Sequence, residues 1–95
     1  MKYFLYIITN KKEGVLYIGF TKGLKKRIYQ HKYKVHPSTF SARYNLDKLV
    51  CFEEFNNEDE ARLREKRMKK WNRAWKIELI EKDNPNWEDL YNKLT

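Results

Sequence analysis

Cysteine is almost absent from this sequence, because Cys51 is the one cysteine among 95 residues. An intrachain disulfide is therefore impossible, and no cysteine-based metal site can be built. This usage is typical of a reducing compartment, so we expect a cytoplasmic protein. We also expect Cys51 to pack as a small hydrophobic residue.

Long hydrophobic runs are absent too. The apolar stretch near the start covers the six residues from Tyr3 to Ile8, which is too short to span a membrane. It also lacks the small-residue cleavage site of a signal peptide. The sequence has no internal repeat, low-complexity tract or linker, and its length suits one core. We therefore expect residues 1–95 to form a single domain with no membrane partner.

Acidic residues are outnumbered. The sequence has 21 Lys and Arg against 13 Asp and Glu, which leaves a net charge of +8. On so small a surface, this excess favours a polyanionic partner such as nucleic acid or an anionic membrane face. Charge alone does not choose between these two partners.

Two apolar runs near the start predict an antiparallel hairpin. Tyr3 to Thr9 is apolar on both faces, and Val15 to Phe20 has the same aromatic and β-branched composition. Residues 10–14 between them have the composition of a turn. The alternation of a strand places Tyr17 and Gly19 on one face, so we expect Gly19 to leave space beside Tyr17.

A basic helix should follow the hairpin. Thr21 is a suitable N-cap, and His31 falls within an apolar stripe at helical spacing, with Arg27 one turn earlier. The stripe consists of Leu24, Ile28, His31 and Val35. We expect the His-Pro-Ser-Thr stretch at residues 36–39 to end this helix, and residues 38–47 to form an exposed connection.

The second half predicts one strand and two helices. Lys48 to Phe55 is the expected third strand, and Asn57 is the expected N-cap of a helix from Glu58 to about Trp71. A further helix should cover Arg73 to Lys82. The predicted fold class is α+β, a three-stranded antiparallel sheet flanked by helices in the order β-β-α-β-α-α.

A glutamate interrupts the apolar stripe of the helix that begins at Glu58. The stripe runs through Ala61 and Met68, and the position between them on the same face is Glu65. An unpaired carboxylate facing inward is expensive, so Glu65 needs a cationic partner. The partner is either a bound cation or, in an ion pair, Arg27 or Arg62.

Five elements of the sequence together carry a family resemblance. In chain order they are Leu5-Tyr6-Ile7, Tyr17-Ile18-Gly19, Arg27, His31 and Glu65. On these residues the chain resembles the GIY-YIG nuclease superfamily, although only the tyrosine of the first motif matches the family name. It most resembles the small stand-alone bacterial members, which share their domain with the nuclease part of the excision-repair endonuclease and with phage homing endonucleases. The resemblance implies a one-metal mechanism for cutting a phosphodiester.

The resemblance gives each of these residues a role. Phosphodiester hydrolysis needs a base for the attacking water, positive charge at the transition state and a neutralised leaving oxygen. Glu65 would be the ligand of Mg²⁺, or of Mn²⁺ in its place. Arg27 would hold the scissile phosphate, and Tyr17 would orient or deprotonate the water. Tyr6 would position water or phosphate. The role of Tyr17 requires nearby positive charge, from the metal, Lys22 or His31.

Two positions depart from the family pattern. Phe20 stands where some relatives carry a lysine near the reactive tyrosine, and Lys22 is the candidate to replace that lysine. The supporting asparagine of relatives has three candidates here, of which we favour Asn84 over Asn72 and Asn86.

Structural explanations compete with these roles. Tyr6 and Tyr17 lie in apolar strands, where a tyrosine is usually part of the core. Core packing is also what we expect of Trp71, Trp75 and Trp87.

The predicted function is a metal-dependent DNA endonuclease of the repair-nuclease type. Its expected nucleic-acid contacts are Lys22, Lys25, Lys26 and Arg67. The alternatives are a nucleic-acid-binding module of the same fold with little turnover, and a structural or interaction protein. With little surface beyond the nuclease core, DNA specificity is low, directed by DNA structure, or supplied by a targeting protein.

Overall fold

Three antiparallel strands in the order β2-β1-β3 form the centre of the structure, a computed structural model that describes residues 1–36 and 38–94. The elements are β1 (Tyr3–Thr9), β2 (Leu16–Thr21), α1 (Leu24–Lys32), α2 (Phe40–Arg43), β3 (Lys48–Phe55), α3 (Glu58–Lys69), α4 (Arg73–Asp83) and the 3-10 turn η1 (Leu90–Lys93). The predicted α+β class, the hairpin and the third strand are confirmed. The short helix α2 was not predicted.

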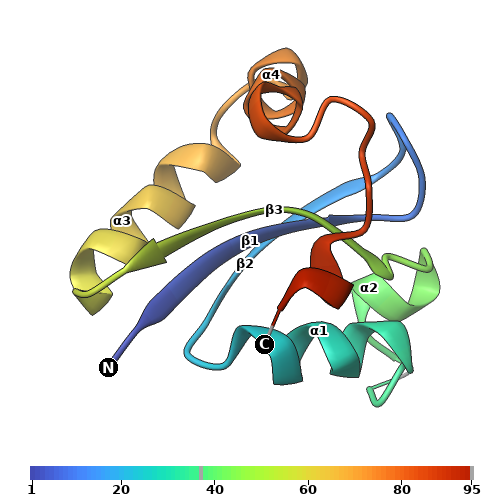
Figure 1. Cartoon of the computed structure of the whole chain (residues 1–95), viewed down its shortest axis with the longest axis horizontal. Helices are drawn as coiled ribbons and strands as arrows, with labels where there is room; N and C mark the ends of the chain where they lie inside the picture. The colour runs from blue at the N-terminus through green and yellow to red at the C-terminus, as the bar shows by residue number, and fades with distance from the viewer. Residues whose placement is uncertain (37, 95) are drawn as a thin grey trace.

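Helices cover both faces of the sheet, with α3 and α4 on one side and α1 and α2 on the other (Figure 1). Alternate residues of β1 therefore enter two different cores. Leu5 and Ile7 pack with Met68 and Ile80 below α3 and α4. Tyr6 and Ile8 pack with side chains on the α1 face, namely Leu24, Ile28, Leu46 and Leu49. The predicted burial of both faces of the first strand is confirmed.

Helix α1 is shorter than its apolar stripe predicted. It ends at Lys32, with Tyr33 as the C-cap, and Lys34 takes a positive φ of 51° that cannot continue a right-handed helix. Val35 is consequently 49% exposed instead of buried. The expected helix end at residues 36–39 was wrong by about one turn, and its proline lies outside the described residues.

The start of α1 also differs from the prediction. The N-cap is Gly23, which makes no side-chain cap hydrogen bond, so Thr21 is not the cap. Thr21 instead closes the turn before the helix, where its Oγ1 accepts a hydrogen bond from the Gly23 N–H at 3.1 Å. A threonine that serves a turn and one that caps a helix have the same sequence signature.

Residues 38–47 are not the exposed connection that their polar composition indicated. Thr39 caps α2 by accepting from the Ala42 N–H at 3.4 Å. Ser41, Ala42 and Leu46 are buried, with exposed fractions of 5%, 7% and 0%. This segment therefore forms a wall of the α1 face of the core.

The two later helices agree with their predicted starts. Asn57 caps α3 by accepting from the Glu60 N–H at 3.1 Å, and Asn72 caps α4 in the same way. Trp87 is buried, but Trp75 is 55% exposed, so the expectation that Trp75 is a core residue was wrong. Cys51 packs beside the α3 core as expected, and burial raises the pKa of its thiol to about 12. Throughout 1–36 and 38–94, no helix combines the length and apolar character needed to cross a membrane.

Candidate active site

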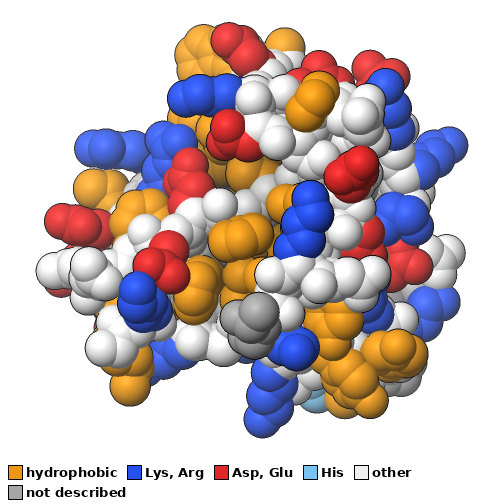
Figure 2. Space-filling model, in the orientation of Figure 1, with side chains coloured by type: hydrophobic (Ala, Val, Ile, Leu, Met, Phe, Trp, Pro, Cys, Tyr) orange, Lys and Arg blue, Asp and Glu red, His pale blue; other side chains and the backbone are white. Residues whose placement is uncertain are grey.

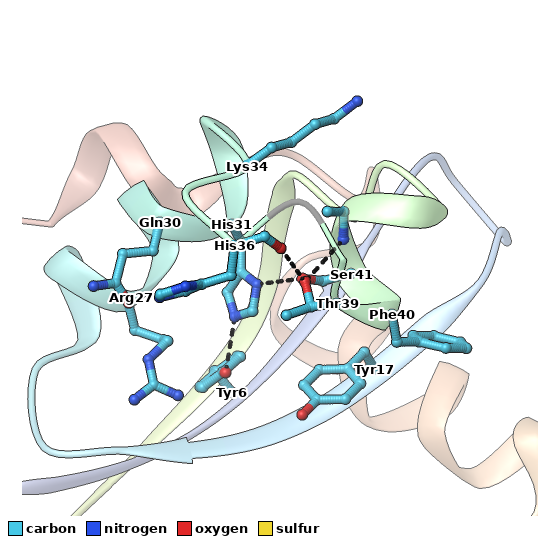
Figure 3. A pocket seen from close by; sticks show the side chains of 11 residues that line it. Tyr6, Tyr17, Arg27, Gln30, His31, Lys34, His36, Thr39, Phe40 and Ser41 are labelled. Atoms are coloured by element: carbon cyan, nitrogen blue, oxygen red, sulfur yellow. Dashed lines mark hydrogen bonds between the residues drawn. The ribbon is translucent and has the colours of Figure 1, made fainter.

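Four of the five residues singled out by the sequence line one pocket of about 300 Å³. Figure 3 shows the Arg27 guanidinium and the phenols of Tyr6 and Tyr17 around the His31 ring. The other lining residues are Gln30, Lys34, His36, Thr39, Phe40, Ser41 and Ala42. Strands β1 and β2 therefore supply the phenols, α1 supplies the cation and the imidazole, and α2 with its N-terminal loop closes the pocket.

Tyr6 is a buried phenol with a polar end. Its ring is 1% exposed, and its hydroxyl lies 3.0 Å from His31 Nε2. Burial, followed by the nearby Tyr17, raises the pKa of Tyr6 to about 12, although the positive charge of Arg27 acts in the opposite direction. Tyr6 is therefore a protonated hydrogen-bond donor at neutral pH.

Gly19 makes room for Tyr6, which corrects the expectation that it makes room for Tyr17. The two residues are directly opposite each other on β1 and β2. A Cβ atom at position 19 would lie 2.4 Å from both Cζ and the hydroxyl oxygen of Tyr6. Because Gly19 does not have a positive φ, the requirement for glycine is one of space and not of backbone conformation.

His31 is held by two hydrogen bonds in a largely buried position. Nε2 faces the Tyr6 hydroxyl, and Nδ1 lies 2.7 Å from Ser41 Oγ. Burial, then the positive charges of Arg27 and His36, lower the pKa of His31 from 6.5 to about 4. His31 is consequently neutral at pH 7, so among the three sources of positive charge that the sequence left open for Tyr17, the lowered pKa disfavours His31.

A chain of hydroxyl groups determines which nitrogen of His31 carries the proton. Thr39 donates to the His36 carbonyl oxygen at 2.8 Å, so its oxygen is free to accept from Ser41 Oγ at 3.2 Å. Ser41 Oγ can then accept from His31 Nδ1–H, which leaves Nε2 to accept from Tyr6. With this assignment each of the four contacts, from Thr39 to the His36 carbonyl, from Ser41 to Thr39, from His31 to Ser41 and from Tyr6 to His31, contains one hydrogen atom.

Ser41 is the residue of this site that sequence reasoning missed. It lies within the segment predicted to be an exposed loop, and a lone serine carries no motif. Its burial follows from α2, a helix of four residues that is too short to show an apolar period. The sequence signal that could have found it is the Thr39 cap followed by Ala42 and Leu46.

Arg27 is an exposed cation at the mouth of the pocket. It lies one turn before His31 on α1, and its charge affects the pKa of both Tyr6 and His31. Among residues 1–36 and 38–94, no carboxylate forms an ion pair with Arg27. Its guanidinium is therefore available to an anion that enters the pocket.

Glu65 approaches the same place from α3, which contacts both β1 and β2. Its side chain is 20% exposed and pairs with Lys69 at 3.5 Å, and its negative charge contributes to the raised pKa of Tyr6. Arg62 pairs instead with Glu58 at 3.4 Å. The ion pair of Glu65 with Arg27 or Arg62, which the sequence left open, is therefore not formed.

The donor set around Glu65 suits Mg²⁺ better than a metal that needs several protein ligands. In the part of the chain that the structure describes, no three His, Cys, Asp or Glu side chains are grouped as a metal site. Mg²⁺ keeps several waters and is often held by one or two carboxylates plus substrate phosphates. A single glutamate that is 20% exposed and lies near Tyr6, a residue of the pocket that also contains Arg27, fits that pattern.

Asn84 lies apart from the pocket. Its buried amide donates to the Val50 carbonyl oxygen at 3.1 Å and to the Glu88 carbonyl oxygen at 2.9 Å, and it accepts from the Glu88 N–H at 3.0 Å. These bonds close the turn after α4. The side chain that we favoured as a support for the metal thus has a structural task.

The expected nucleic-acid contacts, Lys22, Lys25, Lys26 and Arg67, are not among the residues that line the pocket. Lys22, the candidate to replace the family lysine, lies over the Tyr3 ring at 5.9 Å and does not line the pocket that contains Tyr17. Lys25, Lys26 and Arg67 are exposed on α1 and α3.

The lowered pKa of His31 predicts a specific acid sensitivity. His31 binds its proton less readily in the folded than in the unfolded protein, so stability is lost as the pH falls from about 6.5 to about 4. We expect wild type to lose roughly 1 to 3 kcal/mol more than His31→Gln over this interval. Denaturant unfolding at a series of pH values measures the difference, and parallel curves for the two proteins would contradict it.

Known proteins resemble this chain in sequence and fold. The family described as the GIY-YIG catalytic domain matches residues 2–78. The UPF0213 protein CPE1444 of Clostridium perfringens (strain 13 / Type A) is 41% identical over 81 residues, which cover 81% of each chain. The solution NMR structure of the UPF0213 protein BH0048 from Bacillus halodurans gives a TM-score of 0.58 at 25% identity, over 94% of this chain and 93% of that one. The chain belongs to the GIY-YIG catalytic domain family, among its small bacterial UPF0213 proteins.

Proposed function

We propose that this protein is a divalent-metal-dependent endonuclease that hydrolyses DNA phosphodiester bonds. The observation that carries the proposal is the convergence of two phenols, an unpaired arginine and a neutral histidine on one pocket, with the Glu65 carboxylate close enough to perturb Tyr6. These groups together can bind an anion, orient water and hold a cation. A structural role for any one of them does not explain why they meet.

Arg27 is the group that would bind the scissile phosphate. Its planar guanidinium offers several N–H donors that match two phosphate oxygens at once. Negative charge increases on these oxygens as water attacks, so the same contacts strengthen in the transition state. The absence of a carboxylate partner among the described residues leaves these donors available.

Tyr17 would orient the attacking water or accept its proton, while Tyr6 and His31 would hold the wall of the pocket. Transfer of a proton from Tyr6, with a pKa of about 12, to His31, with a pKa of about 4, is strongly uphill. The Tyr6 and His31 pair therefore acts as a neutral hydrogen-bonded unit at pH 7. Tyr17 belongs to the same pocket but is not bound to His31, so its hydroxyl is the phenol that a water can use.

Glu65 would hold Mg²⁺, or Mn²⁺, through its carboxylate oxygens. When bound, the metal ion supplies positive charge to the phosphate and to the leaving oxygen. Glu65 lies on α3 and does not line the pocket, whereas Arg27 lies on α1. The two side chains would therefore contact the substrate from different elements.

A cleavage assay on several nucleic acids tests the proposal. Purified protein is incubated with single-stranded, duplex and branched DNA and with RNA, in Mg²⁺, in Mn²⁺ and in EDTA. Metal-dependent internal cuts in DNA support an endonuclease. Binding without cuts in any metal would instead indicate a nucleic-acid-binding module, and neither binding nor cutting would indicate a structural or interaction protein.

Two variants should reduce cleavage while the fold is retained. Arg27→Ala removes the phosphate contact from an exposed position and should slow cleavage by roughly 100-fold. Tyr17→Phe removes one hydroxyl and keeps the ring, so we expect a loss of roughly tenfold or more. Circular dichroism melts provide the control. If the Tyr17→Phe protein cut DNA at the wild-type rate, the hydroxyl of Tyr17 would have no part in cleavage and Tyr17 would be a packing residue.

A further inference from the structure

A second hollow of about 470 Å³ adjoins the pocket described above. It shares Arg27 and Gln30 with that pocket and adds three more cations, Lys22, Lys26 and Arg62. We call this second hollow the basic groove. No acidic side chain is among the described residues that line it. The basic groove and the catalytic pocket therefore form one continuous surface with Arg27 at their junction.

The basic groove concentrates positive charge in one depression. On the face shown in Figure 2, Lys and Arg side chains are interspersed with Asp and Glu, so no field of a single sign covers it. The groove, by contrast, collects four cations around one depression, from the turn between β2 and α1, from α1 and from α3. Such a concentration attracts an anion more strongly than the same charges scattered over a surface.

Aromatic rings hold two of these cations in place. The Arg62 guanidinium lies over the Phe20 ring at 4.4 Å, and Phe20 in turn stacks on Tyr3 at a centroid separation of 6.1 Å. Lys22 lies over the other ring of this pair, at 5.9 Å from the centroid of Tyr3. Stacking restricts the guanidinium, and apart from the Nη2 contact with Glu58 at 3.4 Å, the N–H groups at its edge remain available to a ligand. Phe20 therefore holds the Arg62 guanidinium, at the position where some relatives carry a lysine.

The chemistry of the groove selects phosphate oxygens as its ligand. A stacked guanidinium and two lysines in an open depression suit an oxyanion that needs several donors. The shared Arg27 connects this anion to the phosphate in the catalytic pocket, so a chain of phosphates fits the surface better than one free ion. We propose that the basic groove binds the phosphate next to the scissile phosphate on the same DNA strand. This inference rests on the proposed function, because it uses the catalytic pocket to place the scissile phosphate.

Helix α3 offers a matched pair of variants. Arg62→Ala removes a cation of the groove, and Arg67→Ala removes the same residue type from the same helix five positions later, on a different face. The sequence placed Arg67 among the expected nucleic-acid contacts, but Arg67 lines neither the catalytic pocket nor the basic groove, so the proposal assigns it no phosphate. Both side chains are exposed, so neither variant should disturb the core. Lys26→Ala is a second groove variant, on α1.

Salt dependence of binding separates the groove from general charge. Affinity for a labelled DNA is measured by fluorescence anisotropy in EDTA, where no cleavage is needed. Each lost phosphate contact should lower the slope of log affinity against log salt by about 0.7 to 0.9. We expect this change for Arg62→Ala and Lys26→Ala and much less for Arg67→Ala. Equal changes of this slope in Arg62→Ala and Arg67→Ala would contradict the proposal that the basic groove binds phosphate.

Short oligonucleotides test the neighbouring-phosphate assignment. Thymidine oligonucleotides with one and with two phosphodiesters, and inorganic phosphate, compete with the labelled DNA at constant ionic strength. For wild type and Arg67→Ala, the second phosphodiester should improve competition by roughly threefold or more, and this gain should shrink in Arg62→Ala. The same gain in Arg62→Ala, or competition by inorganic phosphate equal to that of the longer oligonucleotide, would overturn the proposal. Every measurement here is of binding and none is of cleavage. A result that contradicts the groove proposal is therefore distinguishable from one that contradicts the proposed nuclease activity.

Discussion

Glu65→Gln should remove divalent-dependent cleavage while the protein remains folded and bound to DNA. The change keeps nearly the same volume but replaces an anionic ligand with a neutral amide, which is a weak partner for Mg²⁺. Since a bound metal contributes several kcal/mol to a phosphoryl transition state, we expect a loss on the order of 1,000-fold in rate. Cleavage in Mg²⁺ and in Mn²⁺, with DNA binding measured in EDTA, tests this expectation.

The surroundings of Glu65 favour a small effect of this change on stability. Its one ion-pair partner within the described part of the chain is Lys69, at 3.5 Å, and the Lys69 side chain is 52% exposed. An exposed pair four residues apart on a helix contributes about 0.3 to 0.5 kcal/mol. In the metal-free protein, Gln also removes a negative charge that is 20% exposed and has little compensation. The two effects oppose each other, so the melting midpoint in EDTA should be nearly unchanged.

Lys69→Ala is the matched control for Glu65→Gln. It removes the same ion pair from the other side and leaves the carboxylate in place. If Glu65 acts as a metal ligand, Lys69→Ala should retain cleavage. Loss of cleavage in both variants, or a fall in the melting midpoint of Glu65→Gln in EDTA by more than about 5 °C, roughly 1 kcal/mol for a domain this size, would contradict the ligand role.

The parts of the fold that could be predicted are those whose signal is local. The strands Tyr3–Thr9 and Lys48–Phe55 match their predicted bounds, because their aromatic and β-branched runs are long enough to show strand composition. The cap Asn57 could be predicted because it directly precedes its helix, whereas the cap role of Asn72 was not predicted. Glu65 was noticed because it breaks a helical stripe.

The segment between α1 and β3 could not be predicted, because tertiary contacts determine it. The apolar period continues through Val35, but the positive φ of Lys34 directs the chain toward α2. Ser41 is then buried against His31. The Thr39 cap with Ala42 and Leu46 could have indicated that this segment is buried, but no local pattern specifies the contact between Ser41 and His31. The tautomer of His31 depends on the same contact, and its neutral state depends on burial and on the charges of Arg27 and His36, so the sequence could suggest the histidine but neither of these properties.

Strand register is a second feature of the site that could not be predicted from the sequence. Alternation along one strand associates Gly19 with Tyr17, two residues away on the same face. Pairing between strands instead places Gly19 opposite Tyr6. These two assignments make different predictions about which tyrosine conflicts with a side chain at position 19.

Gly19→Ala should therefore produce the largest loss of stability among these variants. The new Cβ would lie 2.4 Å from Cζ of Tyr6, whose ring is buried and whose hydroxyl is bound to His31. A ring held on all sides cannot move away cheaply, and overpacking of this kind costs about 1 to 3 kcal/mol. Displacement of Tyr6 should also break its contact with His31 and reduce cleavage. Denaturant unfolding and the cleavage assay measure the two effects.

A double-mutant cycle identifies the tyrosine that requires Gly19. In a Tyr6→Leu background the ring is gone, and Gly19→Ala should become neutral or stabilising by about 0.4 to 1 kcal/mol, because alanine restricts the unfolded chain and Gly19 does not need a positive φ. In a Tyr17→Leu background the cost of Gly19→Ala should persist. Relief by Tyr17→Leu, or simple additivity with Tyr6→Leu, would show that glycine is required for some other reason. A reversal of sign confined to the Tyr6→Leu background would instead establish that the glycine of the Tyr-Ile-Gly motif serves the phenol on the neighbouring strand, and thereby the orientation of His31.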